Sequence, residues 1–506
     1  MSALGAPPAS PTDVTPGGEP SSDIPLWVIG VAVVVVLALA GALGFAILSQ
    51  RGSSPDRPAA QTGRTFPTQW DRRIAPYARI AARERGLEFR HPVAVRFLSP
   101  AKFKKGVTTD AEKLTKGDRA DIRNVTGLLR ALGLITGNVN LFRASNDVKG
   151  DSTLAYYSFA DKRITIRGHR LTPSVRATLV HELTHVLQDQ HFHVGARLKR
   201  LDKQSKHGRS TTAWSVLDSI VEGDAQRVEH LYAASLPAKQ RQALVAGQNH
   251  EATQAGRQLT QVPKVLITMM SSPYTLGEGL VQAVAADGGN SAVDHLLRHP
   301  PTHESSLLDP FRVLAGHTGA ARVALPRLRP GERKFDSGEL GVLTWYFMLA
   351  ERLPLTQALA AADGWNGDAY VAYVHDGSSC ARMAYTGRTP LDTSRMYSAL
   401  QGWVAAAPGS PASVTRAGDV VHFQSCDPGT AAQVGKDDSE QAAALLTTRE
   451  GLGIGIMRGG APAARARCIA GRLVQTFSVA ALNDPSFQTD HPNATTQLQQ
   501  IGAACR

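Results

Sequence analysis

The sequence is poor in cysteine. Its 506 residues contain four, Cys380, Cys426, Cys468 and Cys505, and none has the spacing of a CxxC or Cys/His metal site. An even number of cysteines, all in the C-terminal part, predicts two disulfides formed in an oxidising compartment. Of the three possible connectivities we favour the sequential one, 380 with 426 and 468 with 505. Four unpaired, buried thiols are the alternative.

Aromatic residues are also scarce, at 6%, and they do not alternate with basic residues as in a nucleic-acid-binding platform. No nucleic-acid partner is therefore expected. The net charge is +12, from Lys+Arg 55 against Asp+Glu 43. Apart from the stretch Arg197–Arg209, the basic excess is read as spread along the chain, and most of it as solvated surface. Because hydrophobic residues make up 42%, the chain is long and apolar enough for two or three globular units.

Charge is absent from Ile24 to Ser49. As a helix this run would be about 39 Å long, enough to cross a bilayer. A buried soluble helix and a cleaved signal peptide are the alternatives, but residues 1–23 contain no Lys or Arg, unlike the start of a signal peptide. The sequence therefore predicts a disordered tail (1–23), one transmembrane helix (24–49) and a linker (50–66).

Two signals disagree about membrane orientation. Arg51, Arg57 and Arg64 follow the apolar run, and the positive-inside rule taken alone places the C-terminal part in the cytoplasm. The four cysteines favour an oxidising compartment. We expect a single-pass protein of the cell membrane with its C-terminal part outside the cytoplasm.

The rest of the chain predicts an α+β fold. The pattern indicates a helix ending at Gly86, a strand within 91–99, a helix over 119–132, and two short strands around the turn 160–162. Thr172-Pro173 gives an N-cap and a first-turn proline for the next helix, and another helix covers 213–235. Further helices fit 279–286, 291–297 and 340–353. Beyond about residue 364 short β-like runs predict a smaller α/β domain over 365–506, after a larger domain over 67–364.

One short motif carries the chemistry. His181-Glu182-Leu183-Thr184-His185 reads H-E-x-x-H, and the helical repeat of 3.6 residues puts both imidazoles on one face, where they can bind the same Zn²⁺. Glu182 lies beside them and is predicted to be the general base toward a zinc-bound water. Because a chance match is possible, a third ligand is required. No P-loop or GxGxxG unit competes for the chemistry.

Glu222 is the predicted third ligand. It lies 37 residues after His185 on the following helix, between apolar neighbours, where an isolated carboxylate would be costly without a cation. A partly exposed glutamate is the alternative reading, and other acidic residues stay open at lower rank as ligands: Asp218, Glu229 and Glu278. His191 and His193 are read as polar residues at a helix end, and Asp189 as either support for His185 or solvent-exposed.

With "HELTH" followed by "EGDA", the chain resembles the gluzincin class of zinc metallopeptidases. The longer pattern "YYSFADKRITIRG…LVHELTHVLQDQHF…VEGDA…SPYTLGEGLVQAV…HPPTHESSLLDP" is similar to a group of bacterial, often membrane-anchored, predicted metallopeptidases over about residues 68–375. The resemblance implies a mostly helical zincin-like domain with a small sheet, the ligands His181, His185 and Glu222, and the base Glu182.

The resemblance also implies that the strand Arg163–Arg167 is the sheet edge along which a peptide substrate lies. The chain departs from the class at Gln226, where some gluzincins have an aspartate that supports the first histidine. Asp224 is a candidate for that supporting role, and Tyr232 and Tyr274 are candidates for stabilising the oxyanion.

These observations predict a membrane-anchored zinc metalloendopeptidase that acts on protein or peptide substrates. The main alternative is a non-catalytic, membrane-anchored interaction module that keeps a zincin-like fold. A third reading is an adaptor that binds an anionic wall polymer or lipid surface through its basic excess. The sequence does not indicate an oligomeric state.

Overall fold

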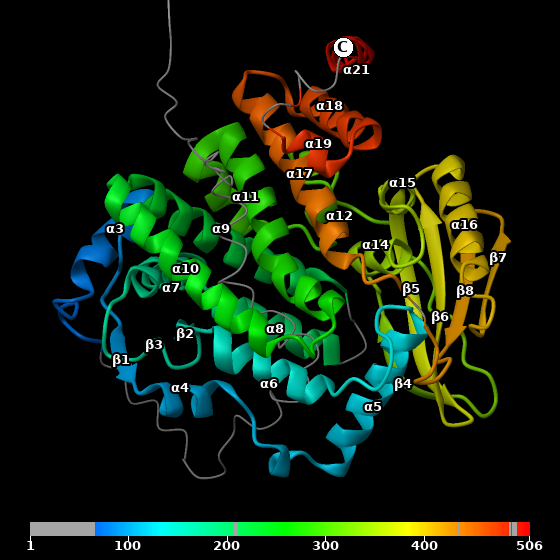
Figure 1. Ribbon diagram of the computed structural model, residues 1–506, viewed down its shortest axis with the longest axis horizontal. Helices are drawn as coiled ribbons and strands as arrows, with labels where there is room; N and C mark the ends of the chain where they lie inside the picture. Colours follow the sequence, from blue (N-terminus) through cyan, green and yellow to red (C-terminus); the bar gives the residue numbers. More distant parts are fainter. Residues whose placement is uncertain (1–65, 207–210, 434, 485–486, 488–492) are drawn as a thin grey trace, which may run out of the picture.

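The computed structural model describes residues 66–506 except for 207–210, 434, 485–486 and 488–492. In this range the chain is an α+β protein, as predicted, with many helices and two small sheets (Figure 1). The predicted tail, transmembrane helix and nearly all of the linker lie outside the described residues. Within the described part, no helix is both long and apolar enough to span a membrane.

The chain runs through its elements in two stretches. The first comprises α3 (Ala75–Arg85), β1 (Ala94–Leu98), α4 (Pro100–Val107), η2 (Ala111–Lys113), α5 (Lys116–Ala131), α6 (Leu141–Ser152), β2 (Ala155–Ser158), β3 (Arg163–Arg167), α7 (Pro173–Phe192), α8 (Val194–Lys206), α9 (Ala213–Ser235), α10 (Ala238–Gln258) and α11 (Lys264–Arg298). The second comprises α12 (Ser305–Leu308), α13 (Phe311–Leu314), β4 (Arg333–Gly338), α14 (Val342–Ala350), α15 (Leu355–Ala362), β5 (Trp365–His375), β6 (Ser378–Gly387), α16 (Pro390–Ala405), β7 (Ala412–Ala417), β8 (Val420–Cys426), α17 (Ser439–Arg458), α18 (Ala463–Thr476), α19 (Val479–Leu482) and α21 (Ala494–Ala504).

Local capping signals set the ends of several helices as predicted. Helix α3 stops at Gly86, which adopts a left-handed φ of 70° that glycine accepts without strain. Helix α7 begins where the Thr172 side chain accepts a hydrogen bond from the Val175 N–H, with Pro173 in the first turn. The helices predicted over 279–286 and 291–297 are parts of one longer element, α11, interrupted at Gly288 and Gly289.

The small N-terminal sheet has the order β1-β3-β2, so one expectation about it is wrong. Strand β3, predicted to be the edge, is central, because β1 pairs with it in parallel and β2 in antiparallel orientation. The connection of β1 to β3 spans 64 residues, and this long-range pairing leaves no local trace in the sequence. Strand β2 is therefore the edge that lies nearest α7.

The second sheet starts before the predicted domain boundary at residue 365. Its order is β4-β5-β6-β8-β7, and β4 contributes the edge strand from residues 333–338. Elements from both sides of the boundary pack together, notably helix α11 with helix α17 and helix α5 with strand β6. Buried hydrophobic residues from Leu128 to Val474 form one continuous cluster. The two predicted domains thus share a core.

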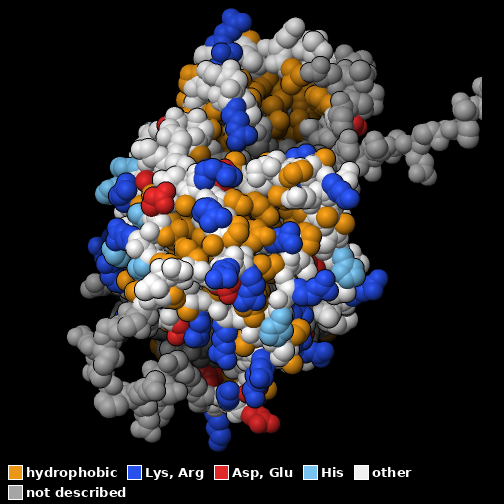
Figure 2. Space-filling view, turned by 90° about the vertical axis from the view of Figure 1, so that its left-hand side faces the viewer, with side chains coloured by type: hydrophobic (Ala, Val, Ile, Leu, Met, Phe, Trp, Pro, Cys, Tyr) orange, Lys and Arg blue, Asp and Glu red, His pale blue; other side chains and the backbone are white. Residues whose placement is uncertain are grey.

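Positive charge is not spread evenly along the chain, contrary to expectation. Residues 66–209 hold 28 Lys and Arg against 13 Asp and Glu, a net +15, whereas residues 210–506 hold 24 against 26, a net −2. The face of the molecule at the left of Figure 1, seen directly in Figure 2, displays many more basic than acidic side chains, with apolar surface between them.

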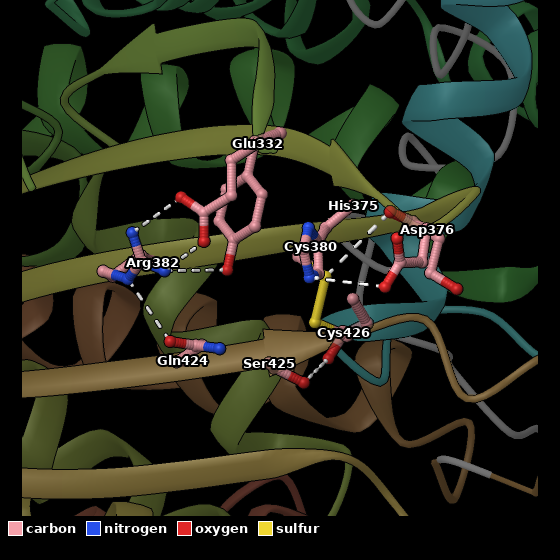
Figure 3. The surroundings of a disulfide bond; sticks show 11 residues. Glu332, His375, Asp376, Cys380, Arg382, Gln424, Ser425 and Cys426 are labelled. Atoms are coloured by element: carbon pink, nitrogen blue, oxygen red, sulfur yellow. Dashed lines mark hydrogen bonds and ion pairs between the residues drawn. A yellow bond between two sulfur atoms is a disulfide. The ribbon is translucent and has the colours of Figure 1, made fainter. Parts of the chain in front are cut away.

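Both disulfides have the sequential pairing predicted from the sequence. Cys380 on β6 bonds to Cys426 on β8, and Cys468 on α18 bonds to Cys505 next to α21. The first joins directly opposed residues of neighbouring strands. Arg382 on β6 pairs at 2.7 Å with Glu332, which lies just before β4, and donates to Gln424 on β8 (Figure 3). Ionic and covalent links thus hold this side of the sheet together.

Candidate metal centre

Helix α7 presents the H-E-x-x-H residues from the interior of the protein. It packs against α3, α9, α10 and β2, and every residue from Leu179 to Gln190 is buried. His181 and His185 lie on one face of the helix with ring centroids 4.7 Å apart. The two imidazoles are therefore close enough to bind the same metal ion.

Helix α9 brings Glu222 to both imidazoles. Its Oε2 lies 3.1 Å from His181 Nε2 and 3.3 Å from His185 Nε2. In the described part of the chain, these three residues form a group whose ligand atoms all lie within 4.8 Å of one another. Ligand atoms of a tetrahedral zinc with bonds of 2.0–2.1 Å are about 3.3 Å apart. The separation of the three predicted ligands thus suits zinc.

Glycines allow α9 and α11 to touch at the level of Glu222. A Cβ on Gly223 would lie 2.1 Å from the carbonyl carbon of Gly277, and a Cβ on Gly277 would lie 1.9 Å from the carbonyl oxygen of Ser219. This contact requires glycine at positions 223 and 277. The glycines meet, whereas Glu278 turns to His230, whose Nδ1 is 2.7 Å from its carboxylate.

Mutual electrostatics favour an ionised Glu222. Burial alone would raise the pKa of this carboxyl, but His185 and His181 lower it to about 2. Burial would likewise lower the pKa of His181, but Glu222 and Glu229 raise it to about 10. The two histidines thus stabilise the buried Glu222 carboxylate electrostatically. A bound cation would stabilise the same carboxylate in the same way.

Glu182 points to the free edge of the small sheet. Its Oε2 accepts a hydrogen bond of 2.6 Å from the backbone N–H of Tyr157 on β2. Because residues of an antiparallel edge strand alternate in direction, this N–H faces away from β3. Burial raises the pKa of Glu182, while the two histidines and the Tyr157 N–H oppose the rise. One carboxylate oxygen is thus anchored beside the three predicted ligands.

The Nδ1 atoms of both imidazoles, on the side away from Glu222, face hydrogen-bond acceptors. His185 Nδ1 lies 2.9 Å from Gln188 Oε1, and His181 Nδ1 lies 3.4 Å from Glu229 Oε2. Such acceptors fix the tautomer in which Nδ1 carries the proton and Nε2 offers its lone pair to a metal. These residues therefore fit a zinc ion. Sequence reasoning missed Gln188, although its spacing of three from His185 was a usable signal, and considered Glu229 only as a ligand.

We expect Glu229 to position His181. The buried Nδ1 and Oε2 have no other hydrogen-bond partner among the described residues, so replacing Glu229 with Leu should weaken zinc affinity by about 10- to 100-fold. Glu229→Gln, which keeps an acceptor, should restore part of it. Competition with a chromophoric chelator measures both. Gln226→Leu, one helical turn away, is the matched control. A larger loss of zinc affinity in this variant than in Glu229→Leu would show that residue 226, and not Glu229, positions His181.

Two acidic candidates have other partners. Asp224 pairs with buried Arg85 at 2.7 Å and accepts from Gln188 at 3.1 Å, so it reaches His185 only through Gln188. Burial raises the pKa of Asp224, but Arg85 and Arg227 lower it below its ordinary value. Asp189 accepts from the Tyr157 hydroxyl at 3.0 Å and pairs with Lys162, which ties β2 to α7. Neither reading of Asp189 holds: it is buried, and Gln188 is the residue that contacts His185 Nδ1.

The two candidate tyrosines differ in position. Tyr274 on α11 lies beside the site, with its ring stacked near His181 at a centroid distance of 6.2 Å. Tyr232 belongs to the core around α7 and meets Tyr77 edge-on, and burial raises its pKa to about 12. His191, read as a polar residue at the helix end, lies with Nε2 2.7 Å from the carbonyl oxygen of Glu88.

Comparison of the chain with protein-family models, curated proteins and solved structures finds no significant match. Any assignment of function therefore depends on the chemistry of His181, Glu182, His185 and Glu222 and on what surrounds them.

Proposed function

We propose that the protein is a zinc-dependent metallopeptidase, held at the cell membrane by the apolar segment Ile24–Ser49. One observation carries this proposal: His181 and His185 from α7 and Glu222 from α9 meet around one point, with Glu182 next to them. A structural zinc site would need no carboxylate base beside the ligands, so the position of Glu182 favours an enzyme over an interaction module.

The proposed reaction is hydrolysis of a peptide bond. Bound zinc would polarise the scissile carbonyl and lower the pKa of the attacking water. Glu182 accepts a proton as the water oxygen bonds to the carbonyl carbon, and it then delivers this proton to the leaving nitrogen as the C–N bond breaks. The Tyr157 N–H holds one oxygen of Glu182 in place for both transfers.

The substrate is proposed to lie along β2. This strand is the edge of the sheet that lies nearest α7, and its Tyr157 N–H donates to Glu182. An extended peptide added to such an edge is held by main-chain hydrogen bonds. Burial of the ligand residues excludes bulk water and strengthens the electrostatic interactions within the site.

The two disulfides support an extracytoplasmic location for the catalytic part. Disulfides persist in oxidising compartments, and all four cysteines are paired. The three arginines after the apolar segment favour the opposite orientation. We give the disulfides more weight, because the positive-inside bias can be overridden by other determinants of topology.

The proposal predicts metal-dependent hydrolysis. The full chain in detergent should cleave members of a mixed peptide library, and 1,10-phenanthroline should reduce the rate by at least about a hundredfold, because the chemistry needs the bound metal. Adding zinc after removing the chelator should restore the rate, as followed by mass spectrometry of the products. Cleavage that is indifferent to the chelator would contradict the proposal.

A further inference from the structure

The surface formed by the first described residues, which follow the predicted membrane anchor in the sequence, is strongly basic. Between residues 66 and 105, nine Lys and Arg side chains are exposed and only one acidic side chain, Glu88, is exposed. We call these nine the arginine face: Arg72, Arg73, Arg79, Arg83, Arg90, Arg96, Lys102, Lys104 and Lys105. They come from α3, β1, α4 and their connections, which lie at the left and lower left of Figure 1, on the side turned to the viewer in Figure 2.

Much of this charge is not neutralised within the protein. Arg73 pairs with Asp71 at 2.7 Å and Arg83 with Glu84 at 2.5 Å. In the described structure Arg72, Arg79, Arg90, Arg96 and Lys102 make no side-chain ion pair. A cluster of exposed cations without counter-charges projects a positive potential and attracts an anionic surface.

The position of the face favours a lipid surface as that partner. The apolar run ends at Ser49 and the described chain begins at Phe66, so 16 residues separate them. At full extension these residues reach about 55 Å at most. The arginine face is the part of the fold that follows this connection directly, so an anchored chain holds it within reach of lipid headgroups.

The aromatic rings of the same segment do not form a platform for stacking bases. Phe66 stacks on His91 at 3.6 Å, Trp70 meets Phe89 edge-on at 4.9 Å, and the Arg73 guanidinium covers Phe97 at 3.9 Å. Single-stranded nucleic acids need open ring faces, which these contacts occupy. A positively charged surface without open aromatic rings suits lipid headgroup phosphates better than nucleic-acid bases.

We propose that the arginine face docks the catalytic part on anionic phospholipid headgroups and so orients it toward the membrane. This inference rests on the proposed membrane anchor but not on zinc or on peptide hydrolysis. It is an electrostatic contact, so it should depend on the lipid charge and weaken as salt shortens the screening length from about 10 Å at 0.1 M to about 3 Å at 1 M.

The test uses the full chain inserted in lipid nanodiscs, either of phosphatidylcholine alone or with about 30% phosphatidylglycerol. An amine-acylating reagent labels the lysines, and mass spectrometry gives the rate at Lys102, with exposed Lys334 and Lys436 on the second sheet and before α17 as internal controls. At 0.1 M salt the anionic lipid should slow labelling of Lys102 by about threefold or more, and 1 M salt should abolish the difference. Labelling of the two control lysines should not change.

Two triple variants each remove three positive charges, one from the arginine face and the other from elsewhere on the surface. Arg72→Gln/Arg79→Gln/Arg96→Gln should remove the lipid effect, whereas Arg322→Gln/Arg465→Gln/Arg472→Gln, which changes exposed residues elsewhere, should keep it. Equal labelling of Lys102 in both lipids, or equal loss in both triples, would overturn the proposal. Protection of Lys102 in neutral discs by soluble poly(glycerol phosphate), without protection by anionic lipid, would assign the face to a polymer instead.

The membrane anchor and the enzyme activity can be measured in the same nanodiscs, independently of docking. Retention of the chain in neutral discs at 1 M salt reports the anchor, because only insertion survives there. Zinc content and chelator-sensitive hydrolysis report the enzyme. If the chain is retained and Lys102 is not protected, the docking inference alone fails.

Discussion

Glu182→Gln is expected to lower the rate of peptide hydrolysis by at least about a thousandfold, because the amide cannot accept the proton of the attacking water. The substitution keeps the size of the side chain, and its carbonyl oxygen can still accept from the Tyr157 N–H. Since Glu182 is not one of the three predicted ligands, zinc content should stay at the wild-type level. Rates on the peptide library and elemental analysis of the same samples measure both quantities.

Glu88→Gln provides the control for loss of a carboxylate on the surface, and it should keep full activity. A Glu182→Gln protein as active as wild type would remove Glu182 from the mechanism. If the wild-type protein bound zinc and hydrolysed no member of the library, the non-catalytic interaction module would be the better account.

Gly223→Ala should destabilise the protein by about 3 kcal/mol, the upper end of the usual cost of overpacking, because a clash with backbone cannot be relieved by a side-chain movement. The new methyl group would lie 2.1 Å from the carbonyl carbon of Gly277, so α9 and α11 would have to separate. Glu222 is the adjacent residue, and its displacement should also weaken zinc binding. Chemical denaturation and a zinc titration measure the two effects.

Gly256→Ala is the matched control for this change. Gly256 lies inside α10 and a Cβ there would meet nothing within 4 Å, so alanine should stabilise the helix by about 0.5–1 kcal/mol. A Gly223→Ala protein with wild-type stability and zinc affinity would show that the contact between α9 and α11 does not position Glu222.

Features with a local cause could be predicted from the sequence. Thr172-Pro173 fixed the start of α7, and the apolar repeat from Leu217 to Tyr232 gave α9 with the bounds that the structure has. The spacing of His181, His185 and Glu222 predicted that they would meet. These results follow from hydrogen bonds and periodicities within one or two turns of a helix.

Features that depend on distant segments could not be predicted. The central place of β3 depends on β1, whose residues pair with residues 69 positions further along the chain. The partner of each imidazole depends on the rotation of α7 and α9 about their axes, which decides between Gln188 and Asp189, and between Gln226 and Glu229. Strand β4 joins the second sheet from before residue 365 and was not predicted, because a short strand with charged residues resembles a loop in the sequence.

The central claim is that His181, His185 and Glu222 together bind one zinc ion. The most direct test is the zinc content per chain of the purified full chain and of Glu222→Ala, measured by inductively coupled plasma mass spectrometry with folding checked by circular dichroism. We predict about one zinc per wild-type chain and less than about a tenth of that in the variant, because losing one of three protein ligands opens the site. A folded Glu222→Ala protein with undiminished zinc, or a wild-type protein that binds none from a zinc-containing buffer, would contradict the account.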